Sequence, residues 1–175
     1  MYHISEKIGV SPWVYWGDAI PRKQAEIVWD ESIEFTSKEP SVKFRGFFMN
    51  DEWPSLGNFV MNTFGDFNVK FYDRVFDLLL RLKGNYFWPA MWSASLCLDG
   101  SKEDPLANVK LATHLGITIG NSHHEPLMRS SEEWDKVKTD TNNVGYGKDW
   151  NYYTNGEGLY RYWEDGVERN KDFKH

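Results

Sequence analysis

The sequence predicts an α/β protein with a parallel sheet, built as the first three βα units of a (β/α)8 TIM barrel after an irregular lead-in. Short β-prone runs alternate with helical patterns along the chain. The first run lacks the glycine-rich turn that opens a doubly wound fold, and each run ends in polar or aromatic residues, where barrel enzymes keep their chemistry. Such a barrel takes roughly 250 residues, so we expect these 175 residues to be part of a larger enzyme.

The first half of the chain supplies one strand and one helix. Residues 1–40 are rich in Trp, Pro and Gly and form the lead-in. Residues 42–50 (VKFRGFFMN) are mostly apolar and predict a buried strand, and residues 50–57 (NDEWPSLG) predict a polar loop. Apolar residues at helical spacing then predict a helix that Asn68 caps and Gly84 ends.

The second half repeats this pattern. Residues 85–90 and 117–121 predict two further strands, with a helix between them that opens at Asp104-Pro105 and stops at Gly116. A polar helix is expected from about Pro126. The last helix is expected from Thr154, which has capping-box spacing to Glu157. Its predicted apolar stripe is Leu159, Tyr160, Trp163 and Val167, and residues 167–175 predict an exposed, charged helix end.

Composition excludes several classes of partner. The net charge of -6 and the absence of a Lys/Arg cluster argue against nucleic acid. No apolar run reaches the roughly 18 residues of a membrane helix, and the first residues lack signal-peptide features. The single cysteine, Cys97, rules out an intrachain disulfide and is expected in the core. The aromatic content of 17% suits sugar binding, although tryptophans also fill large cores.

The end of the first strand carries Asn50, Asp51 and Glu52. Either carboxylate could act as an acid or base, or could bind sugar hydroxyl groups. Because neighbouring residues on an extended chain point to opposite sides, we expect only one of the two acids to face a pocket and the other to bond loop amides. A solvated loop with helix-capping acids is the alternative.

Trp88 and Trp92 follow the second strand. They could form a stacking wall for a sugar ring, or they could pack between strand and loop.

His123, His124 and Glu125 follow the third strand. Consecutive histidines diverge on an extended chain and lack the spacing of a zinc pair, so we expect no metal and no cofactor, with a metal-dependent hydrolase as the weaker alternative. One histidine is expected to contact substrate and the other to be structural. Arg129 could balance these carboxylates, but a solvated helix face is the favoured interpretation.

Four segments together resemble glycoside hydrolase family 115: FRGFFMNDEWPSL, FNVKFYDRVFDLLLRLKGNYFWPAMW, GITIGNSHHEPLMR and WNYYTNGEGLYRYWEDGVERNKDF. Members of that family are xylan α-1,2-glucuronidases, inverting enzymes that remove glucuronic acid or its 4-O-methyl ether. The resemblance implies that residues 41–175 are the N-terminal part of a catalytic barrel and that residues 1–40 come from a preceding α/β domain.

The resemblance also implies which residues line the uronic-acid pocket. Asp51, Glu52 and Glu125 are the candidate catalytic acids, and the substrate contacts would be Asn50, Trp88, Trp92, His123 and His124. Glucuronoxylan or a xylo-oligosaccharide would be the substrate. The full-length protein is expected to be secreted or periplasmic and to form a homodimer. A non-catalytic carbohydrate-binding barrel remnant is the alternative.

The chain also departs from the family pattern. The resemblance implies an arginine-glycine-aspartate segment on a fourth strand and a glutamate on a fifth, and the sequence ends at His175 before either. An inverting enzyme needs two carboxyl groups roughly 6.5–9.5 Å apart. We therefore expect this piece to be inactive when isolated. Trp53 stands where the family usually has a smaller residue and is expected to reshape the first loop.

Overall fold

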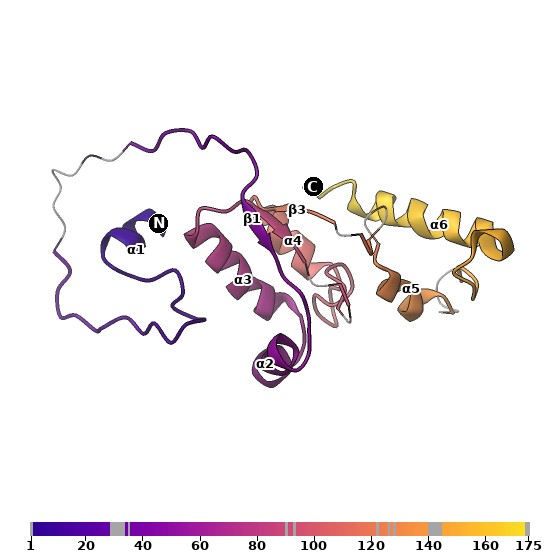
Figure 1. The fold of residues 1–175 in the computed structure, drawn as a ribbon, viewed down its shortest axis with the longest axis horizontal. Coiled ribbons are helices and arrows are strands. Elements are labelled where there is room, and N and C mark those ends of the chain that lie inside the picture. The colour runs from indigo at the N-terminus through magenta and orange to yellow at the C-terminus, as the bar shows by residue number, and fades with distance from the viewer. Residues whose placement is uncertain are drawn as a thin grey trace.

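Three parallel strands form a small sheet in the order β1-β2-β3 (Figure 1). The computed structural model describes residues 2–28, 34, 36–89, 91–92, 94–121, 123–125, 127, 129–139 and 145–173. Strand β1 spans Gly46–Phe48, β2 spans Tyr86–Trp88 and β3 spans Thr118–Ile119, each shorter than predicted. Both strand pairs are parallel, so the predicted α/β class with a parallel sheet is confirmed.

One face of the sheet is covered by helices. Helices α3 (Val69–Arg81) and α4 (Ala107–His114) pack against each other, and α4 also contacts β3. Because side chains alternate along a strand, Phe87 at the centre of β2 points toward the helices. The centroid of its ring lies 6.0 Å from that of Tyr72 and 5.6 Å from that of Phe76. This packing forms the larger of two hydrophobic cores.

The opposite face of the sheet carries exposed rings. Phe48 is 42% exposed and Trp88 is 41% exposed, and their ring centroids lie 6.2 Å apart in an edge-to-face arrangement. Gly120 leaves room on this face for the Tyr86 side chain, since a Cβ there would stand 1.9 Å from the Tyr86 hydroxyl oxygen. Parallel sheets are normally buried on both faces, whereas this face is exposed within the described residues.

The start of helix α3 confirms the predicted cap. The Asn68 side chain accepts hydrogen bonds from the backbone N–H groups of Lys70 and Phe71, at 3.0 and 3.4 Å. At the other end the left-handed residue is Lys83, with φ 62°, rather than the predicted Gly84. Gly84 is needed for a different reason: its N–H reaches the Leu79 carbonyl, and a Cβ would collide with the Leu79 side chain at 2.3 Å.

Helix α2, Ser55–Phe64, begins inside the predicted loop 50–57 and continues through residues for which no element was predicted. Pro54 and Gly57 suggested a loop, but Pro54 precedes the first turn of the helix and Gly57 lies inside it. The Trp53 ring occupies the space beside Gly57, where a Cβ would be 2.5 Å from indole atoms. The tryptophan therefore packs on the helix, and a glycine in that helix makes the contact possible.

Helices α4 and α5 begin later than predicted. Pro105 lies in a turn in which the Asp104 carboxylate accepts from the Leu106 N–H at 3.2 Å, and α4 follows. The predicted stop at Gly116 is confirmed by its φ of 76°. Helix α5 spans Ser131–Val137 and is capped by Ser130, whose hydroxyl accepts from the Glu133 N–H at 3.1 Å. Pro126, the predicted start, lies outside the described residues.

Helix α6, Tyr152–Asn170, differs from its prediction in cap and in face. Asn151 is the N-cap, and the Thr154 hydroxyl donates to Asp149 instead of forming a capping box, so that prediction is wrong. Two members of the predicted stripe, Tyr160 and Val167, are exposed. The buried face is formed by Gly158, Leu159, Tyr162, Gly166 and Asn170.

The second core explains why α6 buries this face and not the predicted one. Tyr162 is fully buried, and its ring lies 5.1 Å from that of Trp134 on α5. Together with Tyr146 and Leu159 these residues form a small core between the two helices, to the right of the sheet in Figure 1. The predicted exposed helix end is also partly wrong, because Asn170 is only 2% exposed.

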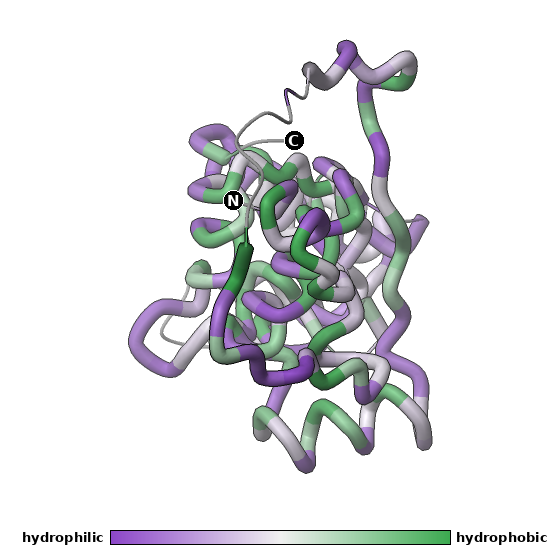
Figure 2. Tube along the Cα trace, turned by 90° about the vertical axis from the view of Figure 1, so that its left-hand side faces the viewer, coloured by the Kyte–Doolittle hydropathy of each residue, from purple (hydrophilic) through white to green (hydrophobic). Residues whose placement is uncertain are grey.

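The lead-in begins with the short helix α1, Tyr2–Lys7, and the described residues that follow it, up to residue 28, run away from the sheet (Figure 1). Hydrophobic and hydrophilic residues interchange along the helices (Figure 2). Within the described residues, no helix has the length and apolar character needed to cross a membrane.

Candidate functional site

The carboxyl ends of the three strands meet at one edge of the sheet, because all three strands run in parallel. Asn50 and Glu52 follow β1, and the Asn50 side-chain amide donates to Glu52 Oε1 at 2.7 Å. Glu52 is exposed, whereas Asp51 between them is 1% exposed. The two neighbouring acids thus face opposite environments, as the alternation along an extended chain predicts.

The Asp51 carboxylate bonds loop amides. Its Oδ1 accepts from the Trp92 N–H and its Oδ2 from the Ala94 N–H, both at 2.9 Å. The prediction that one of the two acids bonds loop amides is therefore confirmed for Asp51, while Glu52 is exposed and its predicted place in a pocket stays a prediction. Charge-assisted bonds of this kind are among the stronger hydrogen bonds in proteins.

Trp92 links the second strand end to the third. Its ring is 42% exposed and lies 4.7 Å from the His124 ring, centroid to centroid. His124 in turn contacts His123, with centroids 4.2 Å apart and planes at 70°. The predicted divergence of the two histidines is wrong. They lie in a turn after β3 rather than on a strand, so their rings can meet.

Glu125 is buried, with 8% of its surface exposed, and it lines a cavity of about 20 Å³ between β3 and the two C-terminal helices. Ser130, Glu133 and Asn170 are among the other polar residues around that cavity. The volume is close to what one water molecule needs. Glu125 therefore lines a small cavity inside the protein, whereas Glu52 is exposed.

Arg129 does not lie on a solvated helix face, and the favoured interpretation is wrong. It is 5% exposed, and its Nε donates to Glu133 Oε1 at 2.8 Å. Arg169 donates to the same oxygen at 2.6 Å, so two guanidinium groups share one buried carboxylate. The aliphatic part of Arg129 fits beside Gly166, where a Cβ would collide with it at 2.4 Å.

The surroundings of the two arginines in this cluster raise the pKa of each guanidinium group. Burial acts to lower the pKa of Arg129, but the Glu133 carboxylate and the Tyr146 hydroxyl outweigh it, so the pKa lies above its usual value. Burial raises the pKa of Tyr162, whose hydroxyl donates to the Ser130 carbonyl at 2.7 Å. This cluster, formed by Arg129, Glu133, Tyr146, Tyr162 and Arg169, fixes the chain that follows the histidines.

Glu133 and Arg169 are members of this buried cluster that sequence reasoning missed. The one available signal was the spacing of four residues between Arg129 and Glu133, which is typical of a helical ion pair. Arg169 carried no local signal, because it lies 36 residues beyond Glu133.

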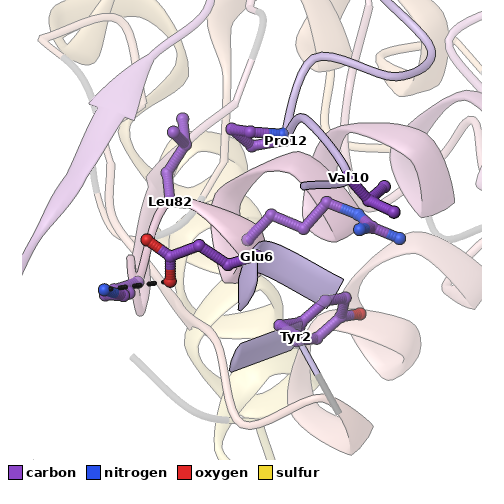
Figure 3. A pocket seen from close by; sticks show the side chains of 7 residues that line it. Tyr2, Glu6, Val10, Pro12 and Leu82 are labelled. Carbon is purple, nitrogen blue, oxygen red and sulfur yellow. Dashed lines mark ion pairs between the residues drawn. The ribbon is translucent and has the colours of Figure 1, made fainter. Parts of the chain in front are cut away.

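A second hollow lies away from this edge. Tyr2, Glu6, Val10, Pro12 and Leu82 surround a cavity of about 210 Å³ between α1 and the end of α3 (Figure 3). Glu6 pairs there with Lys83 at 3.2 Å. Because α3 ends just before β2 begins, this cavity lies toward the amino ends of the strands, opposite to the candidate site. Among the described residues, no group of three His, Cys, Asp or Glu side chains is placed to hold a metal ion.

Helices packed on one face of a small parallel sheet define the class: a mixed α/β protein, with polar groups and exposed rings at the carboxyl ends of its strands. Comparison with known families narrows this class. The model of glycosyl hydrolase family 115 matches residues 37–175. The chain therefore belongs to glycosyl hydrolase family 115, and the resemblance noted in its motifs is confirmed.

A solved structure agrees with this assignment. It is described as a family GH115 4-O-methyl-α-glucuronidase with specificity for decorated arabinogalactans. The two chains are 32% identical and superpose with a TM-score of 0.73. The match covers 96% of this chain and 21% of the relative, so the chain spans about a fifth of that protein. No curated protein matches the sequence.

Proposed function

We propose that the chain supplies part of the active site of an α-glucuronidase that removes glucuronic acid or its 4-O-methyl ether from polysaccharide side chains. Family membership and the activity named for the solved relative support this proposal. The observation that carries it is the open edge of the sheet, where the exposed Glu52 follows β1 and the contacting rings of Trp92, His124 and His123 follow β2 and β3.

Among the three candidate acids, Glu52 is the one that a substrate can reach. Asp51 and Glu125 are both buried, so we assign them supporting roles beneath the site. Asn50 orients Glu52 through its amide, and its Oδ1 is buried without a hydrogen-bond partner among the described residues. Trp92 and the two histidines, with Trp88 on the sheet, would contact the sugar.

An inverting reaction also needs a second carboxyl group, roughly 6.5–9.5 Å from the first. We propose that this acid lies on later strands of a (β/α)8 barrel whose first three units are residues 41–175, with residues 1–40 as the end of a preceding domain. The ring-bearing face of the sheet supports the barrel, because that face would become the packed barrel interior.

The polymer is the least determined part of this function. The family resemblance implies xylan, whereas the solved relative is described as specific for decorated arabinogalactans. A terminal uronic acid is common to both, so we propose glucuronoxylan as substrate with decorated arabinogalactan as the competing polymer.

The first test measures uronic acid released from each polymer by the purified chain. We expect no release, because the second acid is proposed to lie elsewhere. Release from glucuronoxylan would support the glucuronidase assignment and overturn the proposed incompleteness of the site. Release from arabinogalactan alone would instead move the substrate to that polymer.

The second test measures binding. Xylo-oligosaccharides with and without a 4-O-methylglucuronic acid branch are titrated against tryptophan fluorescence. Tighter binding of the branched sugar, weakened by Glu52→Gln, supports the proposal. Equal binding of both sugars would favour a non-catalytic carbohydrate-binding role for the exposed rings of Phe48 and Trp88. Absence of saturable binding to either sugar would overturn both functions for this chain.

A further inference from the structure

We propose that Asp51 is a positioning residue: it holds the segment after β2 so that the Trp92 ring lies against His124. The proposal rests on the proposed function only where it gives that ring pair a role in sugar binding. The geometry and the main experiment below are independent of any sugar.

Asp51 connects two parts of the chain that are far apart in sequence. Its two carboxylate oxygens accept hydrogen bonds from the N–H groups of Trp92 and Ala94, which lie 41 and 43 residues further along the chain. These two amides belong to the irregular segment between β2 and α4, whose described residues include no strand or helix. A buried acceptor that binds two of its amides therefore restrains the backbone from which the Trp92 ring projects.

The restraint passes on to the third strand end. The Trp92 ring contacts His124 at 4.7 Å, and His124 contacts His123 at 4.2 Å. One carboxylate after β1 thus sets the relative position of side chains that follow β2 and β3. Asp51 is 1% exposed while Trp92 is 42% exposed, so a ligand at this edge meets the ring and not the carboxylate.

An amide at this position cannot replace the carboxylate. A carboxylate offers two acceptor oxygens to two N–H donors, whereas asparagine offers one oxygen and one NH₂ group. In Asp51→Asn one backbone N–H would face another donor, which leaves a buried group unpaired. We expect the segment to shift in response and the Trp92 ring to leave His124, while helices α3 and α4 keep their packing.

The experiment follows the imidazole ring protons of the whole chain by NMR. A proton beside an indole ring is shifted by the ring current, so the His124 resonance, assigned by its loss in His124→Gln, reports the Trp92 contact. The Trp92→Leu variant lacks the indole ring, so it gives the position of the His124 resonance without the ring current. We expect Asp51→Asn to move the His124 resonance most of the way to that position, while His3 and His114 stay unchanged. Glu52→Gln is the matched control and should leave the His124 resonance in place.

Two results would overturn the proposal. One is a His124 resonance that stays at its wild-type position in Asp51→Asn, and the other is a Trp92→Leu variant that does not move it. If the resonances of His3 and His114 show that Asp51→Asn has unfolded, Asp51→Glu takes its place. That variant keeps the charge and both acceptors but displaces them, so the His124 resonance should move in the same direction, and an unchanged resonance would again contradict the proposal.

The sugar titration separates this inference from the proposed function. Where the branched oligosaccharide binds, Asp51→Asn should weaken its binding as Trp92→Leu does. If the wild-type chain binds no sugar, the glucuronidase proposal fails, and the NMR result still decides whether Asp51 positions Trp92.

Discussion

Glu133 is completely buried and accepts hydrogen bonds from both Arg129 and Arg169. A buried charge of this kind depends on its partners, because removing one partner leaves the others desolvated and unpaired. The pairing also explains why Arg129, which sequence reasoning placed in solvent, lies inside the molecule. Its guanidinium group is 3.9 Å from the centroid of the Tyr162 ring and stacks on it.

Replacing Glu133 with glutamine should therefore be costly. Glu133→Gln keeps the shape but removes the buried negative charge that Arg129 and Arg169 share, and we expect the free energy of unfolding to fall by about 3–5 kcal/mol. Urea denaturation followed by circular dichroism measures the change. Glu132→Gln, one residue earlier in the same helical turn, is the matched control and should change stability by less than about 0.5 kcal/mol. Equal effects of the two substitutions would contradict the role given to the cluster.

Cys97 offers a test of burial with a pH dependence. Burial raises the pKa of its thiol to about 11 from a usual value of 9.0. We expect iodoacetamide to label the folded chain about a hundredfold more slowly at pH 8 than the chain unfolded in urea, because the thiolate is the reactive form. As the only cysteine, it gives an unambiguous readout by mass spectrometry, and similar rates in both states would contradict its burial.

The same pKa shift predicts how stability depends on pH. The folded state binds the thiol proton more tightly than the unfolded state does. This contribution to stability is therefore complete below about pH 9 and is lost as the pH rises toward about 11. Cys97→Ala should remove that part of the slope, and an unchanged slope between these two pH values would refute the prediction.

The strands of the sheet approach each other closely at two glycines, Gly46 in β1 and Gly120 after β3. Both lie on the face that carries Trp88, but their surroundings differ. A Cβ on Gly46 would stand 1.6 Å from the Tyr86 carbonyl oxygen, which is backbone, whereas a Cβ on Gly120 would meet the hydroxyl end of the Tyr86 side chain. A side-chain end can swing aside, but a paired strand cannot move without losing its hydrogen bonds.

These two glycines form a matched pair of variants. Gly46→Ala should separate β1 from β2 and lower the free energy of unfolding by about 3 kcal/mol or more, as overpacking against fixed atoms does. Gly120→Ala should cost only about 1 kcal/mol, with a shift in tryptophan emission as the Tyr86 and Trp88 rings move. Thermal and urea denaturation measure both, and a larger loss for Gly120→Ala would show that the face is packed differently.

At the scale of the whole molecule, the described residues form two hydrophobic cores and leave one sheet face uncovered. The larger core lies between the sheet and helices α3 and α4, and the smaller one lies between α5 and α6. Outside these cores, Phe48 and Trp88 stand exposed on the sheet, and within the described residues β1 and β3 each pair on one side only. Open edges and an apolar face together favour association.

We therefore expect the purified chain to associate as its concentration rises. Light scattering coupled to size-exclusion chromatography measures the mass. Phe48→Lys places a charge on the apolar face beside the β1 edge and should shift the mass toward 20.6 kDa. Tyr153→Lys, which alters a fully exposed ring at the start of α6, should not. A wild-type chain that stays monomeric at high concentration would show that the face needs no cover.

Much of the secondary structure could be read from the sequence, because caps and turns act over a few residues. The cap at Asn68, the stop at Gly116 and the order of strands and helices followed from local chemistry. Helix α2 was missed because Pro54 and Gly57 signal a turn locally, and only the Trp53 ring that packs on Gly57 explains why a glycine suits that helix.

The sequence alone was also enough to identify the family and the candidate residues at the strand ends. It could not say which acid is buried, since that depends on two amides more than forty residues from Asp51. It could not say which face α6 buries, because Trp134 and Arg129 meet that helix only in the folded chain. Local pattern constrains neighbours along the chain, whereas the environment of a charge is set by whatever packs against it in space.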